Sequence, residues 1–431
     1  MAVPDGGCGQ LPLSGRKGVR LQVVGAALAG MSPRASTKTT VGIVGGGPAG
    51  LMLAHLLARA GVESVVVEVR SRAEIEQTVR AGILERDSVR LLVESGVSDR
   101  VLREGHEHQG IDLAFGGTGH RIDLQDLTGA SVWLYPQTDV FIDLAAARDR
   151  DGGDVRYGVT STSVVDVTTD RPGVLFTDAD GVECEVRCDY LVGADGSRSI
   201  CRQMLPTAQR RDYYREYPFA WFGILCDAPV SAPELVYSHS DRGFALISQR
   251  TESMQRMYFQ CDPAEDVDAW SDDRIWTELQ ERVGANGYSL KEGPITSKTV
   301  LLFRSYVCEP MRYGSMLLAG DAAHTVPPTG AKGLNLALAD VRLLAELLTD
   351  AVTTRRSEVL DAYTERALAR VWKAQHFSYW MTTMLHRLPD ASDFDVRRQV
   401  GELTSVVTSR AGSTYLAEAY TGWPAGSPIG G

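Results

Sequence analysis

The sequence is poor in cysteine, and its few cysteines are scattered. Seven occur among 431 residues, an odd number without regular spacing, which excludes a disulfide scaffold and favours the reducing cytoplasm. Cys184 and Cys188 form a C-x3-C pair, but neither a second pair nor a nearby histidine completes a set of metal ligands. No metal site is therefore predicted.

Positive charge and long apolar runs are also scarce. Lysine and arginine number 44 against 55 aspartates and glutamates, a net charge of −11, so the summed field repels nucleic acid and anionic membranes. The longest apolar stretch near the N-terminus, Leu21 to Met31, is far shorter than the roughly 20 residues of a membrane-spanning helix. With 44% hydrophobic and 23% charged residues, the chain is typical of a folded enzyme or binding protein of two or three domains.

The first ordered segment that the sequence predicts is a βαβ unit. The apolar run Val41–Val44 is typical of a buried parallel strand, Leu51–Ala60 of a helix, and Val62–Val67 of a second strand that ends in Glu68. Between the first strand and the helix lies a G-x-G-x-x-G sequence. This order of elements is the fingerprint of a dinucleotide-binding fold.

Each glycine of the fingerprint has its own physical task. Gly45 permits a tight turn, Gly47 lets a pyrophosphate approach the backbone, and Gly50 allows the helix to pack closely on the strand. The helix N-terminus supplies partial positive charge for the phosphates. Glu68 is placed to accept hydrogen bonds from a ribose diol. FAD and NAD(P) satisfy this pattern equally well.

A second motif favours a flavin. The apolar strand Ser315–Ala319 runs into Gly320 and Asp321, and a loop then leads to a helix expected over 333–348. An acid at a strand end beside a helix N-terminus suits a ribityl chain, and the helix dipole suits a reduced flavin that carries negative charge. Asp195, in the sequence Gly193–Gly196, is a third acid at a strand end.

An alternating pattern from about Tyr217 to Thr299 predicts a β-rich region between these motifs. Period two places Phe244, Leu246, Ser248 and Arg250 on one face of a strand. A hairpin loop over 251–255 would pair Arg250 with Arg256 and Ser248 with Tyr258. Such a pocket suits an aromatic carboxylate, because an anion between the two arginines would relieve their repulsion. A solvated pair of arginines on a surface hairpin is the alternative.

These segments resemble the 4-hydroxybenzoate 3-monooxygenase (p-hydroxybenzoate hydroxylase) family of FAD-dependent aromatic hydroxylases, from about Val41 to Pro424. The matching motifs are Arg80–Gly82, Tyr217–Phe219, Arg242–Leu246, Ser248–Arg250, Gly320–Asn335 and Met384–Arg387. The resemblance implies an α/β fold: a GR2-like, Rossmann-type FAD-binding domain, an inserted β-rich substrate domain and a helical C-terminal region. Members of the family are commonly homodimers.

The resemblance also implies domain boundaries. The FAD-binding domain is expected in three parts, at 39–107, 134–212 and 301–355, and the substrate domain in two, at 108–133 and 213–300. A helical C-terminal and dimer region is expected at 356–424, a disordered extension at 1–38 and a frayed tail at 425–431. Trp372, Phe377, Tyr379 and Trp380 lie along an expected helix of the C-terminal region, where core and subunit packing explain them.

Carried over position by position, the resemblance implies roles for single residues. The substrate-binding residues implied are Ser248, Gln249, Arg250, Tyr258, Tyr237 and Pro328. The implied catalytic machinery is a proton relay of Tyr237 and Tyr420 with His108 as its outlet toward solvent, the Pro328 carbonyl near the phenol, and Lys332 as a source of positive potential. The implied FAD contacts are Gly45, Gly47, Ala49, Gly50, Glu68, Arg80, Ala81, Gly82, Gln137, Asp195, Arg256, Asp321, Leu334 and Asn335.

The activity implied is hydroxylation of 4-hydroxybenzoate to 3,4-dihydroxybenzoate by a flavin 4a-hydroperoxide, with FAD bound, O2 as co-substrate and NADH or NADPH as electron donor. The same chemistry on 4-aminobenzoate or 3,4-dihydroxybenzoate is the nearest alternative. A simple NAD-dependent dehydrogenase would leave the Gly320–Asp321 loop without a purpose, and a non-catalytic flavin-fold protein would not need the relay.

One segment departs from the NADPH-using relatives. Val69, Glu74 and Thr78 stand where those relatives carry Arg, Tyr and Arg, and Glu74 and Glu76 would repel a 2′-phosphate. NADH is therefore the expected donor, preferred over NADPH.

Overall fold

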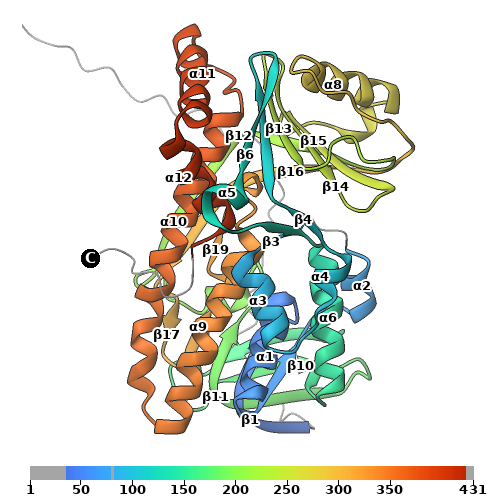
Figure 1. Ribbon diagram of the computed structural model, residues 1–431. Helices are drawn as coiled ribbons and strands as arrows, with labels where there is room; N and C mark the ends of the chain where they lie inside the picture. Colours follow the sequence, from blue (N-terminus) through green and yellow to red (C-terminus); the bar gives the residue numbers. More distant parts are fainter. Residues whose placement is uncertain (1–34, 79–81, 424–431) are drawn as a thin grey trace, which may run out of the picture.

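The computed structural model describes residues 35–78 and 82–423. It contains a mainly parallel sheet flanked by helices in the lower half of Figure 1 and a second, mainly antiparallel sheet in the upper half. The long helix α10 (Ala362–Leu385) runs alongside both halves. Among the described residues, no helix is long and apolar enough to cross a membrane.

The first sheet carries the dinucleotide fingerprint. Strand β1 lies at its centre and pairs in parallel with β11 and β2, and the sheet continues through β18 and β8. Its strands are β1 (Ala35–Val44), β2 (Ser64–Val67), β8 (Asp154–Arg156), β9 (Thr160–Val165), β10 (Gly173–Thr177), β11 (Glu183–Gly193), β17 (Arg312–Tyr313) and β18 (Met316–Leu318). This arrangement contains the predicted βαβ unit, because α1 (Pro48–Arg59) connects two parallel neighbours.

The start of β1 corrects one expected boundary. Residues 35–38, which the sequence placed in a disordered extension, form the first part of the strand and pair with Cys184–Arg187 of β11. The segment is polar, but threonine is a good strand former and β11 offers a long free edge. Residues 1–34 and the expected frayed tail at 425–431 lie outside the described residues.

The second sheet has the order β19-β16-β12-β15-β14-β13-β5-β6. Its strands are β5 (Gly110–Phe115), β6 (Thr118–Asp123), β12 (Arg211–Asp227), β13 (Leu235–Ser240), β14 (Gly243–Gln249), β15 (Met254–Cys261), β16 (Ile295–Glu309) and β19 (His324–Thr325). The chain enters this sheet at β5 and β6, as expected for 108–133. The long strands β12 and β16 pair with each other and continue across the expected boundaries at 212 and 300.

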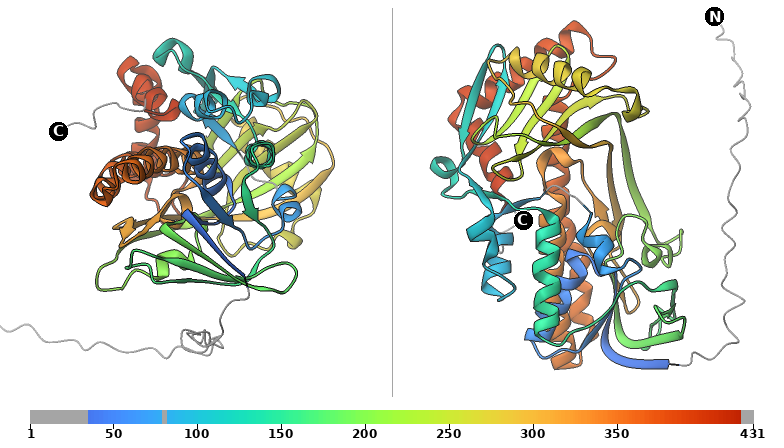
Figure 2. Two further views of the ribbon diagram at one scale, coloured as in Figure 1. Left: turned by 90° about the horizontal axis from the view of Figure 1, so that it is seen from below. Right: turned by 90° about the vertical axis from the view of Figure 1, so that its right-hand side faces the viewer.

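Both faces of the second sheet are buried, but under different elements. One face packs against α8 (Asp272–Gly284) through residues such as Phe222, Phe259 and Trp276. The other face, which includes Tyr237, packs against helices of the C-terminal region. The right-hand view of Figure 2 shows α8 on the outer side of this sheet. Alternate residues of each strand therefore serve two separate cores.

Short strands and helices join the two halves. The small third sheet has the order β3-β7-β4 and consists of β3 (Ile83–Glu85), β4 (His106–His108) and β7 (Val132–Leu134). The remaining helices are α2 (Arg72–Glu76), α3 (Arg86–Glu94), α4 (Arg100–Glu104), α5 (Leu124–Thr128), α6 (Gln137–Arg150), α7 (Ile200–Gln203), α9 (Gly333–Thr354), α11 (Asp393–Thr408) and α12 (Arg410–Thr421). Four 3-10 turns are Val267–Ala269, Gly320–Ala322, Pro328–Gly330 and Ser357–Asp361 among the described residues.

Candidate active site

The glycines of the fingerprint have the geometry that their expected tasks require. Gly45 has a φ of +104°, and a methyl group on it would lie 2.3 Å from the Ala194 carbonyl oxygen. A methyl group on Gly50 would lie 1.9 Å from the Gly45 oxygen, whereas one on Gly47 would meet no atom within 4 Å. Gly47 therefore leaves open space at the N-terminus of α1, where no described side chain caps the helix, and a pyrophosphate fits there.

Three motifs that are far apart in sequence meet at this point. A methyl group on Gly45 would lie 2.3 Å from the Ala194 carbonyl oxygen and 2.8 Å from the Cα of Asp195. A methyl group on Gly320 would lie 3.7 Å from the Cβ of Ala49. Arg202 of α7 adds a link that the sequence did not predict, because its Nη1 donates to the Ala322 carbonyl at 2.7 Å. The convergence of these strand ends beside one helix N-terminus is the arrangement that a dinucleotide site requires.

Two of the acidic residues of these motifs already make hydrogen bonds within the protein. Glu68 accepts hydrogen bonds from the backbone N–H groups of Gly46, at 2.7 Å, and Arg70, at 2.9 Å, so its carboxylate also fixes the fingerprint loop. Asp195 accepts from the Ser199 hydroxyl at 2.6 Å and the Ile200 N–H at 2.7 Å and thereby caps α7. This capping role was missed from sequence, and the direct cofactor contacts of Glu68, Asp195 and Asp321 stay predictions.

Further residues that were predicted to contact FAD also lie together. A methyl group on Gly82 would lie 2.7 Å from the backbone nitrogen of Gln137, the first residue of α6. The side-chain amide of Asn335 donates to the Ile83 carbonyl at 2.8 Å, directly after Gly82. Leu334 precedes Asn335 in the first turn of α9. The expected contacts Arg80 and Ala81 lie outside the described residues.

The register of the substrate hairpin corrects the predicted pairing. Ser248 lies opposite Arg256, and Leu246 lies opposite Tyr258, whereas the sequence placed Arg250 opposite Arg256. The returning strand β15 begins at Met254, because the turn is tighter than expected and the Arg250 N–H bonds to the Met254 carbonyl at 2.8 Å. A shift of two residues keeps the same side chains on the same face.

The shared face therefore survives the change of register. Tyr237 on β13 lies opposite Leu246 on β14. Leu246 in turn lies opposite Tyr258 on β15, so the three residues form a row across the sheet. Ser248 follows two residues after Leu246, and Arg250 comes two residues later again. Four of the predicted substrate residues, Tyr237, Ser248, Arg250 and Tyr258, are thus brought to one face, as period two predicts, whereas Gln249 alternates away from it and Pro328 lies in a 3-10 turn outside the sheet.

The two relay tyrosines meet across this face. The hydroxyl oxygens of Tyr237 on β13 and Tyr420 on α12 lie 2.7 Å apart, and both residues are buried. Burial raises the pKa of Tyr237, and burial together with the neighbouring Tyr237 raises the pKa of Tyr420. Both side chains are therefore neutral hydroxyls near pH 7, able to accept one proton while donating another.

The guanidinium of Arg250 has a donor that is free to bind an anion. Burial, together with the nearby Arg256, lowers the pKa of Arg250 to about 10, and its Nη2 is buried without a hydrogen-bond partner among the described residues. Tyr258 is buried as well, and the Arg256 guanidinium lies 5.3 Å from its ring centre. A buried donor without a partner is costly, and a substrate carboxylate would satisfy it. The buried Nη2 of Arg250 argues against the alternative of a solvated arginine on a surface hairpin.

Lys332 is more tightly held than the sequence indicated. Its ammonium is 2% exposed and donates to the Glu85 carboxylate at 2.7 Å and to the Tyr420 carbonyl at 3.0 Å. Burial lowers the pKa of Lys332, and the charge of Glu85 opposes that shift. Sequence reasoning missed Glu85 because 247 residues separate the partners. Glu85 favours the charged form of Lys332 and holds its ammonium beside the relay.

His108 and Pro328 have other neighbours than the relay tyrosines. His108 is 1% exposed, its Nε2 lies 3.4 Å from the amide nitrogen of Gln249, and burial lowers its pKa to about 4. The ring is therefore neutral and can accept a proton, but in this conformation it does not open directly to solvent. The Pro328 carbonyl accepts from the Ala331 N–H at 2.9 Å. Ser248 makes only a long contact, 3.4 Å to the Gln249 carbonyl.

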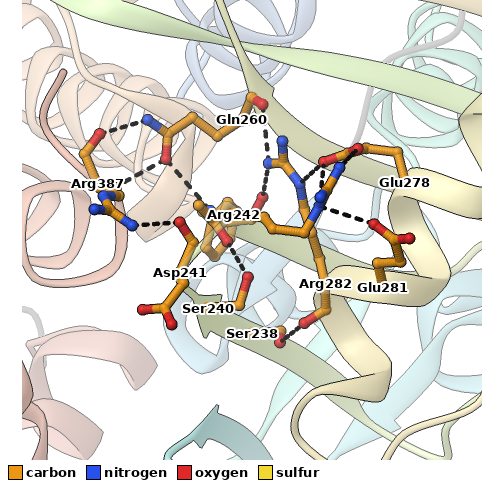
Figure 3. A network of polar contacts seen from close by, with 11 residues as sticks. Ser238, Ser240, Asp241, Arg242, Gln260, Glu278, Glu281, Arg282 and Arg387 are labelled. Carbon is orange, nitrogen blue, oxygen red and sulfur yellow. Dashed lines mark hydrogen bonds and ion pairs between the residues drawn. The ribbon is translucent and has the colours of Figure 1, made fainter.

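A polar network explains why two further motifs of the resemblance occur together (Figure 3). Arg242 contacts Glu278 of α8, and the same carboxylate accepts from Arg282 Nε at 2.7 Å. Arg282 also donates to the Gln260 carbonyl at 2.9 Å, and the Gln260 side chain bonds to the Arg387 backbone. The network ties α8 and the end of α10 to the sheet that carries the substrate face.

Comparison with known proteins agrees with this geometry. Residues 38–378 match the family model described as FAD binding domain. Over 389 residues the chain is 43% identical to p-hydroxybenzoate hydroxylase from Acinetobacter baylyi, covering 90% of this chain and 96% of that protein. It is 26% identical to a solved Diels-Alderase of pyrroindomycin biosynthesis, with a TM-score of 0.71 and coverage of 89% and 80%. The p-nitrophenol 4-monooxygenase of Pseudomonas putida DLL-E4 shares the fold at 20% identity, with a TM-score of 0.74 and coverage of 90% and 100%.

Fold, site and comparisons together define an FAD-dependent aromatic hydroxylase, a flavoprotein monooxygenase. The cradle at Gly47, the strand-end acids and the cluster of Gly82, Gln137 and Asn335 all fit FAD. Within this class, the chain belongs to the p-hydroxybenzoate hydroxylase family.

The surroundings of Gly47 and Gly50 predict that alanine at the first position weakens FAD binding, whereas alanine at the second position lowers stability. Gly47→Ala should fold normally, because the added methyl group meets nothing, but should weaken FAD binding at least about tenfold by filling the space of the pyrophosphate. Gly50→Ala should instead lower the free energy of unfolding by about 3 kcal/mol. FAD fluorescence titration of the apoprotein and thermal unfolding measure the two effects. Normal FAD affinity in Gly47→Ala would contradict the assignment of the cradle.

Proposed function

We propose that this enzyme hydroxylates 4-hydroxybenzoate at carbon 3 to give 3,4-dihydroxybenzoate, with O2 and a reduced nicotinamide nucleotide as co-substrates. The observation that carries the proposal is the pairing of two features on one sheet face: the buried, unpartnered Nη2 donor of Arg250 and the Tyr237–Tyr420 hydroxyl pair. A ring with a carboxylate at one end and a hydroxyl opposite satisfies both. The similarity to p-hydroxybenzoate hydroxylase over 90% of the chain supports this substrate.

The roles of the side chains follow from their chemistry. Arg250 binds the carboxylate with a planar pair of donors, and Tyr258 beside it offers a further hydroxyl. Tyr237 accepts the proton of the substrate hydroxyl while it passes its own to Tyr420, and Tyr420 releases its proton in turn toward solvent, with His108 as the proposed outlet. The loss of this proton makes the ring electron-rich at the carbon beside the hydroxyl. Bound FAD would supply the electrons that reduce O2, and O2 is the source of the oxygen atom that is transferred. Lys332, held against Glu85 and the Tyr420 carbonyl, adds positive potential that favours the phenolate.

A panel of para-substituted benzoates tests the substrate. With 4-hydroxybenzoate, NADH oxidation should accelerate and yield 3,4-dihydroxybenzoate in near-equal amount. With 4-aminobenzoate or 3,4-dihydroxybenzoate, product should be absent or minor, because the relay is matched to a para hydroxyl. Failure of 4-hydroxybenzoate to stimulate NADH oxidation by the flavin-loaded enzyme would remove the proposal.

The electron donor proposed is NADH, in preference to NADPH. Helix α2 begins with a capping box in which the Glu74 carboxylate accepts a hydrogen bond from the Ser71 N–H at 2.7 Å. Arg72 is paired with Glu76 at 2.7 Å and with Asp149 at 2.5 Å. A 2′-phosphate would therefore meet two glutamates and an arginine whose charge is already balanced.

The preference for NADH over NADPH is predicted to depend on the charges of residues 74–78. The wild-type kcat/KM for NADH should exceed that for NADPH at least about tenfold, and the double variant Glu76→Gln/Thr78→Arg should raise the NADPH value about tenfold with little change for NADH. Glu63→Gln, a charge change on the turn before β2, serves as the control. Equal or better efficiency of the wild type with NADPH would contradict the proposal.

We also propose that the protein is a homodimer of the cytoplasm, without nucleic acid or membrane partners. An outer patch of α10 and β12 supports the dimer: Trp372 and Tyr379 are 43% and 39% exposed, and Tyr213 contacts Trp372 edge-on with ring centres 5.2 Å apart. Arg215 lies 4.9 Å from the Tyr379 ring centre. Exposed aromatic side chains beside arginine are typical of interface cores.

Light scattering tests the dimer. The wild type should have twice the chain mass of 46.8 kDa, and Trp372→Glu should shift it to the monomer, because a charge in an apolar interface costs several kcal/mol. Phe394→Glu changes another exposed aromatic, on α11, and should leave the mass unchanged. A monomeric wild type, or a dimeric Trp372→Glu variant, would contradict the patch as the interface.

A further inference from the structure

A buried histidine and aspartate lie behind the turn that contains Asp321. Asp340 of α9 is 3% exposed and His324 is 2% exposed, and His324 Nε2 lies 2.6 Å from Asp340 Oδ2. The same carboxylate oxygen accepts the Gly320 N–H at 2.9 Å. One oxygen atom of α9 therefore holds both ends of the turn from Gly320 to His324.

This turn is the part of the second motif that faces the fingerprint. Gly320 has a φ of +60°, and a methyl group on it would lie 3.1 Å from the Cβ of Ala337 and 3.7 Å from that of Ala49. The turn is thus pressed between α9 and the start of α1. Its exact position decides where Asp321 stands relative to the nucleotide cradle.

The charges of the cluster also depend on the histidine. Burial disfavours the protonated ring, but the carboxylates of Asp340 and Asp321 outweigh burial and raise the pKa of His324. Without a positive ring, the negative charges of buried Asp340 and half-buried Asp321, which both act on His324, would lose this counter-charge behind the turn that faces the nucleotide cradle. Such a cluster of negative charges repels a dianionic cofactor.

We infer that His324 and Asp340 are positioning residues for FAD: they fix the Gly320–His324 turn and balance its negative charge, so that Asp321 can approach the cofactor. Neither residue belongs to the fingerprint, the substrate face or the tyrosine relay.

Two variants of the pair test the inference on the flavin itself. Asp340→Asn keeps the shape and one acceptor for the Gly320 N–H but removes the charge, and FAD should bind the apoprotein about tenfold more weakly. His324→Gln keeps a donor toward Asp340 without a positive charge and should also weaken binding, by about three- to tenfold. In both variants the two visible absorption bands of bound flavin should shift relative to the wild type, because the local field has changed.

The control is a buried ion pair of similar kind that is far from the cofactor motifs. Glu278→Gln breaks the contact with Arg282 in the network of Figure 3, and it should lower the melting temperature while FAD affinity and the flavin spectrum stay as in the wild type. If Asp340→Asn and His324→Gln lose only melting temperature, as Glu278→Gln does, and bind FAD with wild-type affinity and spectrum, the inference is overturned. If Asp340→Asn does not fold, His324→Gln alone decides by the same two readouts.

Discussion

Replacing Arg250 by lysine is expected to raise the dissociation constant for 4-hydroxybenzoate about 100-fold, which corresponds to about 2.8 kcal/mol. Arginine offers two parallel N–H donors to a carboxylate, and one of the terminal nitrogens is buried and unpartnered in the structure. Lysine offers a compact point charge and begins from an ordinary pKa of about 10.4. The burial that lowers the pKa of Arg250 to about 10 would also lower the pKa of a lysine at this position toward neutral pH, so that its positive charge would be held less firmly than that of arginine.

Titration of the flavin absorbance with 4-hydroxybenzoate measures this effect directly. Arg274→Lys is the matched control, because Arg274 lies on the outer helix α8 and stacks on Trp270 with its guanidinium 3.6 Å from the ring centre. Its replacement should leave the dissociation constant within about twofold of the wild type. A similarly small change for Arg250→Lys would mean that the substrate carboxylate binds elsewhere.

The cofactor half of the site could be predicted because it depends on the conformations of residues that are close together in the sequence. The turn at Gly45, the open cradle at Gly47 and the tight packing at Gly50 are set by φ angles and by the first turn of one helix. A strand of period two likewise assigns its face without knowledge of the partner strand, and so Ser248 and Arg250 were placed correctly although the hairpin register was wrong by two residues. The register depended on the turn, whose closure at Met254 the sequence did not signal.

The rest could not be predicted because it depends on pairs that only the fold brings together. Glu85 is the counter-charge of Lys332, yet it looks like an ordinary acid before a helix. Asp340 looks like a polar residue on an otherwise apolar helix, until His324 and Gly320 are found on the same oxygen. A buried charge that has no partner nearby in sequence is the signal that could have been used, since such a charge needs a distant partner.

Replacing either relay tyrosine by phenylalanine is expected to slow product formation about 100-fold while the substrate still binds. Phenylalanine keeps the ring of Tyr237 or Tyr420 in the same apolar cluster but removes a hydroxyl that lies 2.7 Å from its partner. The substrate proton then has no acceptor in line, so NADH oxidation continues and hydrogen peroxide is released instead of product. The carboxylate contact with Arg250 is unchanged, and the dissociation constant should rise less than about fivefold.

The two hydroxyls act in series, which gives this prediction a second, quantitative consequence. Once one hydroxyl is missing the relay is already cut, so the double variant should form product no more slowly than the slower single variant. Tyr217→Phe serves as the control, because its hydroxyl bonds to Ser305 at 3.1 Å in the same cluster, outside the relay. The ratio of 3,4-dihydroxybenzoate formed to NADH consumed should stay at the wild-type value in Tyr217→Phe and fall in both relay variants. An unchanged ratio in both Tyr237→Phe and Tyr420→Phe would show that the proton leaves the substrate by another path.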